Sequence, residues 1–229
     1  MDMDKLKVQK ELGSFVGRLL REQFGRGPET IFATISGSVV TIYFTKFLSP
    51  LEKTLLQKEE SLYVQKTRDL LMETLIDEIS EHIHLSAGIQ VNEFYYDWNL
   101  EKQSGMFVAI GNEAMGRESY PAQSEVEKEV KRLTKEAEKQ PDVVFSSLIN
   151  NRTILIIREG LLINIEKELN RLGFQETLKL AKRNLERRLI EEHKSAFEKQ
   201  LNAQLIDFFV DWNFDRDKST ILFILKPKE

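Results

Sequence analysis

The chain repeats itself at a fixed period of 114 residues, and this repetition constrains the fold more than any other feature of the sequence. The tripeptide Asp97-Trp98-Asn99 recurs as Asp211-Trp212-Asn213, 114 residues later. The same offset aligns further positions: Leu51-Glu52-Lys53 with Ile165-Glu166-Lys167, Leu55 with Leu169, Arg68 with Lys182, Leu71 with Leu185 and Gln90 with Gln204. One register that holds through segments of different periodicity indicates a tandem duplication of one folding unit.

A chain of 229 residues suits two small domains, because a repeat of this length can form its own hydrophobic core. The segment from Gly111 to Ser124, which joins the repeats, contains two glycines and a proline, which is typical of a connection. We therefore predict a first repeat over residues 1–111, a linker over 112–124, and a second, more divergent repeat over 125–229.

Composition excludes several classes of function. The 37 acidic and 33 basic residues leave a net charge of −4, so the chain lacks the basic surplus of a typical nucleic-acid-binding protein. It has no cysteine, which excludes disulfides, thiol catalysis and thiolate metal sites and is consistent with a reducing compartment. We expect no nucleic-acid partner.

The N-terminus is charged and leads into an amphipathic pattern, so we see no secretory signal there. The longest uncharged stretch, residues 30–45, falls short of the roughly 20 apolar residues that a membrane-spanning helix requires. The sequence therefore predicts no transmembrane segment and a cytoplasmic location, with peripheral association at the inner face of the membrane as a further option.

Hydrophobic periodicity predicts the same series of elements in each repeat: α-β-β-α-α-β-β. In the first repeat we expect helices over residues 5–24 and 61–85, a short helix after Ser49-Pro50, and strands over 31–35, 39–44, 89–98 and 106–110. Ser49 and Glu52 form a capping box at the start of the short helix; in the second repeat the cap can move to Asn164.

Alternation places Phe94, Tyr96 and Trp98 on one sheet face. The predicted fold class is α+β, with an antiparallel sheet in each unit and helices packed on one face. The strand order stays open.

No motif for catalysis or for a cofactor is present. The chain lacks G-x-G-x-x-G, G-x-x-x-x-G-K-[ST] and G-x-S-x-G. His82 and His84 are two positions apart, so on a helix their imidazoles diverge and cannot share one ion. We therefore predict no catalytic residue, no cofactor and no metal site.

The strongest candidate for a binding site is the loop Gly25-Arg26-Gly27-Pro28. Two glycines beside an arginine can present backbone N–H groups and a guanidinium to a phosphate or carboxylate. The alternative is a helix C-cap followed by a proline turn. The second repeat has Lys139-Gln140-Pro141-Asp142 at this place, so any function of the loop would be confined to the first repeat.

Asp97 and Asp211 form a second candidate, because they occupy equivalent positions at strand ends. If the repeats pack about a pseudo-twofold axis, the two carboxylates could approach each other and act as an acid and a base. The alternative is structural: aspartate and asparagine open a turn while the tryptophan anchors the sheet.

The first repeat resembles the MpsC family of bacterial proteins. The resemblance rests on the Gly-Arg-Gly-Pro loop and the hairpin after it, on Phe47-Leu48-Ser49-Pro50-Leu51-Glu52-Lys53, on residues 64–68, and on Gly88-Ile89-Gln90-Val91 with Asp97. It implies a role beside cation-translocating subunits, in a system linked to membrane potential and inorganic-carbon uptake. It supplies no catalytic residue, and a tandem form departs from the single domain typical of the family.

Three hypotheses about function follow. The first is a non-enzymatic accessory or interaction protein whose partner is a protein, such as a membrane complex, contacted through Arg26 and its loop. The second is a regulatory module that senses an anion or nucleotide. The third is an enzyme that uses Asp97 and Asp211. Pseudo-symmetric packing of the two repeats, or a homodimer, is compatible with each.

Overall fold

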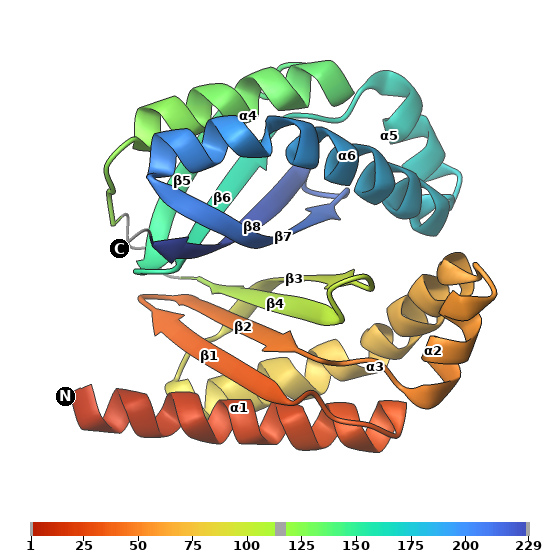
Figure 1. Ribbon diagram of the computed structural model, residues 1–229, viewed down its shortest axis with the longest axis vertical. Coiled ribbons are helices and arrows are strands. Elements are labelled where there is room, and N and C mark those ends of the chain that lie inside the picture. The colour runs from red at the N-terminus through yellow and green to blue at the C-terminus, as the bar shows by residue number, and fades with distance from the viewer. Residues whose placement is uncertain (1, 113–117, 228–229) are drawn as a thin grey trace. The chain divides into compact units, whose positions relative to one another are not determined.

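The computed structural model describes residues 2–112 and 118–227 and divides the chain into two compact units, Met1–Gly116 and Arg117–Glu229. Unit 1 contains α1 (Asp2–Phe24), β1 (Thr30–Ser36), β2 (Val39–Thr45), α2 (Pro50–Gln57), α3 (Ser61–Ala87), β3 (Val91–Asn99) and β4 (Ser104–Gly111) (Figure 1). Unit 2 contains α4 (Gln123–Ala137), β5 (Val143–Asn150), β6 (Thr153–Glu159), α5 (Asn164–Arg171), α6 (Gln175–Leu201), β7 (Ala203–Asn213) and β8 (Lys218–Pro227). The predicted element order is confirmed in both units.

The segment predicted as a linker, residues 112–124, is only partly described. Residues 113–117 lie outside the described residues, and 118–122 belong to unit 2. The helix α4 already begins at Gln123, inside that predicted segment. The helix therefore begins two residues before residue 125, where the second repeat was predicted to start.

Each unit contains one antiparallel sheet of four strands. The order is β1-β2-β4-β3 in unit 1 and β5-β6-β8-β7 in unit 2. The predicted antiparallel sheets are therefore confirmed, and the strand order that the sequence left open is the same in both. The central strands β2 and β4 are almost uniformly buried, whereas β1 is a half-buried edge strand.

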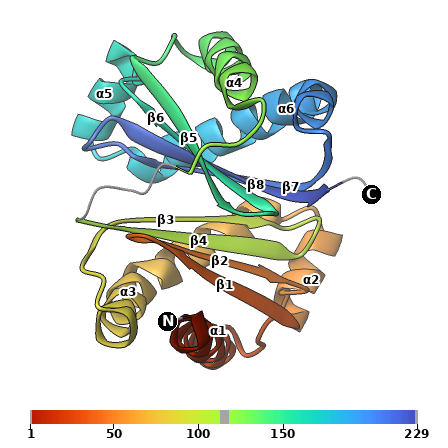
Figure 2. The same ribbon diagram turned by 90° about the vertical axis from the view of Figure 1, so that its left-hand side faces the viewer.

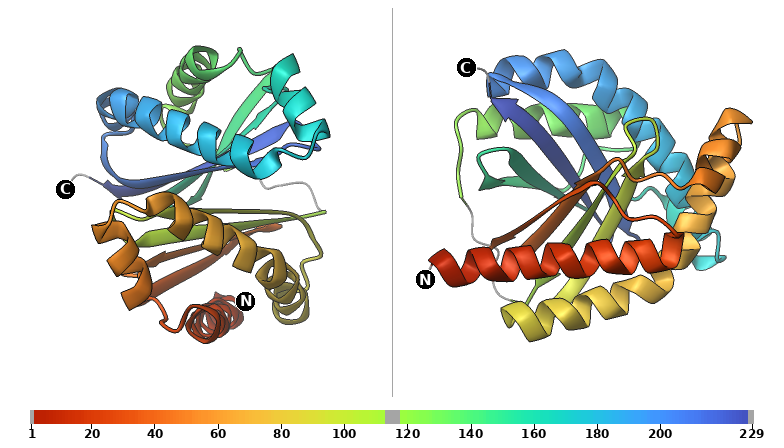
Figure 3. Two further views of the ribbon diagram at one scale, coloured as in Figure 1. Left: turned by 90° about the vertical axis from the view of Figure 1, so that its right-hand side faces the viewer. Right: turned by 60° about the horizontal axis from the view of Figure 1, so that its bottom comes forward.

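The long helices cover one face of each sheet, as predicted (Figures 2 and 3). In unit 1, α1 and α3 pack on the face that carries Tyr96 and Trp98, which confirms the strand alternation expected from the sequence. This core is formed by Leu12, Val16, Leu19, Leu20, Met72, Leu75, Ile79 and Ile83 from the helices, together with apolar residues of the sheet. A matching core in unit 2 includes Phe208, Val210 and Trp212.

The start of the short helix differs between the units. Ser49 caps α2, and Glu52 completes the capping box: Glu52 N donates to Ser49 Oγ at 3.3 Å and Ser49 N donates to Glu52 Oε2 at 2.7 Å. In unit 2 the cap position is Ile163, not Asn164 as we expected. An isoleucine side chain cannot accept a hydrogen bond, so the capping box is incomplete. Its remaining hydrogen bond is donated by Ile163 N to Glu166 Oε2 at 3.0 Å.

The edge strands β1 and β5 correspond to each other at an offset of 113 residues, one residue less than the 114-residue period of the repeat. Ala33 pairs with Ile42, and Ser146 pairs with Ile156, the repeat equivalent of Ile42. Ser146 is therefore the structural equivalent of Ala33 although it lies 113 residues later. A bulge between Leu148 and Asn150 restores the 114-residue period before β6.

Candidate functional site

The predicted anion-binding loop, residues 25–28, joins α1 to β1. Gly25 has a φ of 71°, the left-handed conformation in which glycine commonly ends a helix. Arg26 is exposed. A Cβ atom at Gly27 would lie 3.0 Å from the carbonyl oxygen of Gly17 and 3.2 Å from Arg21 Nε. The glycines thus serve the close return of the chain over α1, and Arg26 is left accessible.

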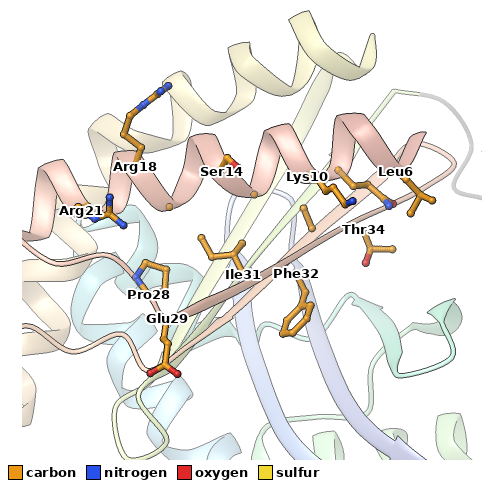
Figure 4. Close-up of a pocket in the computed structure, with 14 residues that line it drawn as sticks. Leu6, Lys10, Ser14, Arg18, Arg21, Pro28, Glu29, Ile31, Phe32 and Thr34 are labelled. Atoms are coloured by element: carbon orange, nitrogen blue, oxygen red, sulfur yellow. The ribbon is translucent and has the colours of Figure 1, made fainter. Parts of the chain in front are cut away.

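An open groove of about 770 Å³ lies between α1 and β1, next to this loop (Figure 4). Pro28 and Glu29, at the end of the loop, line one part of it, and residues of α1 and β1 line the rest. A volume of this size is in the range of small-molecule sites. The loop and the groove therefore form one continuous candidate surface in unit 1.

Two glycines of α1 shape this groove. A Cβ atom at Gly17 would lie 2.8 Å from Ile31 Cδ1, and one at Gly13 would lie 3.5 Å from Ile31 Cγ2. Because neither position carries a side chain, α1 can lie close to β1. The same absence of side chains leaves the space along β1 unfilled.

The groove carries more positive than negative charge. It is lined by Lys10, Arg18 and Arg21 and by one carboxylate, Glu29, which already pairs with Lys46 at 2.7 Å. Within residues 2–112 and 118–227, none of the three basic side chains makes an ion pair. The groove is therefore suited to a ligand with carboxylate or phosphate groups.

The outer edge of β1 forms the other wall of the groove. In an antiparallel pair, every second residue of a strand makes no backbone hydrogen bond to the partner strand. In β1 these residues are Ile31, Ala33 and Ile35, so their backbone N–H and C=O groups point away from β2. Ile35 N donates to Gln9 Oε1 at 2.9 Å. In the described part of the chain no acceptor contacts Ala33 N, so this stretch of the edge is open.

The equivalent edge of unit 2 is covered. Leu148 N donates to the carbonyl oxygen of Glu118 at 2.9 Å. Ser146 N donates to Glu127 Oε1 at 2.8 Å, and Gln123 Nε2 donates to the carbonyl oxygen of Ser146 at 2.9 Å. Unit 2 thus satisfies with its own residues the edge that unit 1 leaves open.

Comparison with known proteins gives one result. The family model described as "Na+-translocating membrane potential-generating system (MpsC)" matches residues 4–113 and, separately, residues 121–227. The chain belongs to the MpsC family. Both repeats match, so the resemblance and the tandem duplication inferred from the sequence are confirmed. No curated protein and no solved structure matches the chain.

The description of the MpsC family refers to a membrane system. Among residues 2–112 and 118–227, however, no helix is both long and apolar enough to cross a membrane. The same residues contain no group of three or more histidine, aspartate or glutamate side chains placed to hold a metal ion. His82 stacks on Phe15 with ring centres 3.8 Å apart. Burial, followed by the charge of Arg18, lowers the pKa of His82.

In this MpsC protein the two predicted aspartates have structural contacts of their own. Asp97 Oδ1 accepts a hydrogen bond from the backbone N of Trp98 at 2.7 Å. Asp211 Oδ1 lies 2.8 Å from Lys179 Nζ in an ion pair. Asp97 lies on β3, at the edge of the sheet opposite to β1. Of the loop residues 25–28, only Pro28 lines the groove, and Asp97 does not line it.

Our interpretation of the sequence missed a buried ion pair that occurs once in each MpsC repeat. Arg68 Nε lies 2.7 Å from Glu52 Oε1, and Lys182 Nζ lies 2.8 Å from Glu166 Oε1. Burial alone would raise the pKa of Glu52, but the hydrogen bond and charge of Arg68 outweigh it and lower that pKa. The signal was available, since both repeats retain opposite charges at the same two positions.

Proposed function

We propose that the chain is a non-enzymatic accessory protein that binds a protein component of a Na+-translocating membrane system at the cytoplasmic face of the membrane. The family match supports the association with such a system. The observation that carries the proposal is the contrast between the units: the groove beside β1 is open and basic, whereas unit 2 covers the same place with its own residues.

The groove and its loop have the features of a surface for an acidic protein segment. Arg26 is exposed beside Pro28, and Arg21 and Lys10 line the groove without an acidic partner in the described residues. Arginine in such a position can bind a carboxylate through two parallel hydrogen bonds. In this proposal unit 1 makes the functional contact, and unit 2 serves as a structural partner.

Co-purification from detergent extracts of host membranes tests the proposal. Arg26→Ala should reduce recovery of the membrane partner, and the double variant Lys10→Ala/Arg21→Ala should reduce it further, because each removes a positive charge from the surface. Arg152→Ala is the matched control, since Arg152 is an exposed arginine in the hairpin turn of unit 2. If all of these variants recover the same membrane proteins as the wild type, the proposal is wrong.

A second candidate function is the sensing of a small anion or nucleotide. The unpaired basic residues of the groove favour it, because phosphate could bind there without a protein partner. Inorganic phosphate or ATP should then raise the melting temperature of the wild type, and Lys10→Ala/Arg21→Ala should abolish the shift. An enzyme that uses Asp97 and Asp211 is the third alternative; detectable turnover that is lost in Asp97→Asn would favour it.

A further inference from the structure

The covered edge of unit 2 shows what kind of chain segment can lie in such a groove. Residues 118–120 run beside β5: Glu118 N donates to Ser147 Oγ at 3.0 Å, and the carbonyl oxygen of Glu118 accepts from Leu148 N at 2.9 Å. The hydroxyl of Tyr120 lies 2.8 Å from Ser146 Oγ. The occupant is a short segment that meets the strand edge partly through its backbone.

Unit 1 lacks this cover because the equivalent residues fold differently. The positions aligned with residues 118–122 are residues 4–8, which belong to the first turns of α1. Glu127, which accepts the hydrogen bond from Ser146 N, is replaced at the aligned position by Gly13. The edge of β1 therefore has neither the covering segment nor a carboxylate at this position that could accept a hydrogen bond from Ala33 N.

We propose that the outer edge of β1 binds an extended, acidic segment of a partner protein as an additional strand. This inference rests on the proposed function and specifies the partner surface. Backbone groups of the segment pair with Ile31 and Ala33, whose N–H and C=O groups point away from β2. Strand addition of this kind obtains affinity from main-chain hydrogen bonds and specificity from alternate side chains.

The side chains around the edge define the composition of the segment. Phe32 is 60% exposed and stacks on Tyr43, so it offers an aromatic surface to a side chain of the added strand. Lys10 and Arg21 line the groove at different turns of α1 and favour carboxylates. Gln9 already binds Ile35 N, which marks one end of the open stretch. A segment with an apolar residue between acidic residues fits this surface.

Peptide binding to the full-length protein tests the inference directly. The probe is a fluorescent peptide of about eight residues in which tyrosine, valine and threonine alternate between terminal glutamates, a length that spans a typical strand. We expect fluorescence anisotropy to show saturable binding and NMR to show slower exchange of the Ala33 amide. The same peptide with N-methylated backbone amides should bind at least tenfold more weakly.

Two pairs of variants separate strand addition from general charge attraction. Gly13→Glu places at this position the carboxylate that unit 2 uses and should reduce peptide affinity at least tenfold. Gly13→Ala is its control, since a Cβ there meets Ile31 at an ordinary contact distance of 3.5 Å. Ala33→Pro removes the outward N–H, which an edge strand tolerates, and should also abolish binding. Ala33→Ser, the residue of unit 2, should retain it.

Three outcomes would overturn the inference. The first is that the peptide does not bind the wild type at millimolar concentration. The second is that the N-methylated peptide, Gly13→Glu and Ala33→Pro all behave like their controls. The third is that inorganic phosphate or anionic lipid vesicles displace the peptide and bind the Ala33→Pro variant unchanged, which would indicate a simple anion site. If the Arg26-dependent membrane partner is still recovered in any of these cases, strand addition fails while the proposed function stands.

Discussion

A buried cation occupies the same position in both units and pairs with the equivalent glutamate in each, but in unit 1 it also lies over three aromatic rings, whereas in unit 2 it lies over one ring and meets a second carboxylate. Arg68 Cζ lies 4.7 Å from the ring centre of Phe47 and 4.8 Å from that of Trp98. At the equivalent place Lys182 Nζ contacts the carboxylates of Glu138 and Glu166. A planar guanidinium can stack on rings while it binds a carboxylate, whereas a compact ammonium is a point charge without a flat face to stack. The nature of the cation thus follows its environment.

The difference extends over several neighbouring positions that have changed together. At the 114-residue offset, unit 2 replaces Phe24 by Glu138, Phe44 by Arg158, Met72 by Glu186 and Gly105 by Ser219. Arg158 is fully buried and binds Glu186 at 2.7 Å, Ser219 Oγ at 2.8 Å and Thr134 Oγ1 at 2.9 Å. The polar groups of this core therefore form a connected set, in which the buried charges are paired.

The largest effect is expected when one member of this set is removed. Arg158→Met leaves Glu186 fully buried without its cationic partner and should lower the free energy of unfolding by about 3–5 kcal/mol. Urea unfolding measures the loss, and hydrogen exchange in β6 and β8 assigns it to unit 2. A loss below about 1 kcal/mol would show that the ionic set contributes little to the stability of this core.

Converting Arg158, Glu186 and Ser219 together to their unit 1 equivalents should recover most of this loss. The double variant Arg158→Phe/Glu186→Met should not suffice, because in unit 1 the ring of Phe44 occupies the space where a Cβ at position 105 would lie, only 2.6 Å away. Adding Ser219→Gly should restore stability. Equal stability of the double and triple variants would contradict this account of the difference.

The next largest effect is a pH dependence that unit 1 should lack. Burial, and then the charge of Glu186, raises the pKa of Glu138 from 4.5 to about 8, although Lys182 opposes this. Between these values the folded state holds a proton that the unfolded state has released. Stability of unit 2 should therefore fall as pH rises from about 4.5 to 8, by an amount on the order of 2–4 kcal/mol.

Urea unfolding of the wild type at several pH values in this window measures the slope. Glu138→Gln should flatten it, because the amide does not titrate, and Glu138→Phe should do the same with the residue that unit 1 has at this position. A slope that persists in both variants would assign the pH dependence to another group.

A smaller effect is expected from Gly105→Ser, which places the residue of unit 2 in unit 1. The new Cβ would meet Phe44 Cε2 at 2.6 Å and Trp98 Cε3 at 2.8 Å, so the aromatic cluster must shift. We expect a loss of about 1–3 kcal/mol in the free energy of unfolding. Combining it with Phe44→Leu should recover part of the loss; if it does not, the steric explanation is wrong.

The smallest effects are expected at the two helix caps. Ser49→Ala should cost about 1 kcal/mol, because it removes the acceptor for Glu52 N. Ile163→Ser should add up to about 1 kcal/mol in unit 2, because it supplies the missing half of the capping box. Thermal unfolding of both variants and of the wild type measures the two changes in melting temperature, which we expect to have opposite signs. A shift in the same direction for both variants would contradict this explanation.

Much of the fold could be predicted from the sequence because it rests on local periodicity. Alternation identified the buried face that carries Tyr96 and Trp98, and Ser49-Pro50 marked a helix start. The groove was only partly predictable, because Arg26 and Gly27 indicated the loop but not the groove beside it. The edge of β1 is open because residues 4–8 are helical and because position 13 is a glycine. Neither feature indicates a binding site by itself.

The sequence by itself determined the duplication, the element order and the orientation of the faces, since each depends on spacing along the chain. Only the tertiary structure decided the strand order, the one-residue shift between β1 and β5, and which buried charges meet. Glu186 and Arg158 are 28 positions apart, and their pairing reflects which strand and helix pack together. Distances of this kind are set by the fold as a whole, and for that reason no local pattern reveals them.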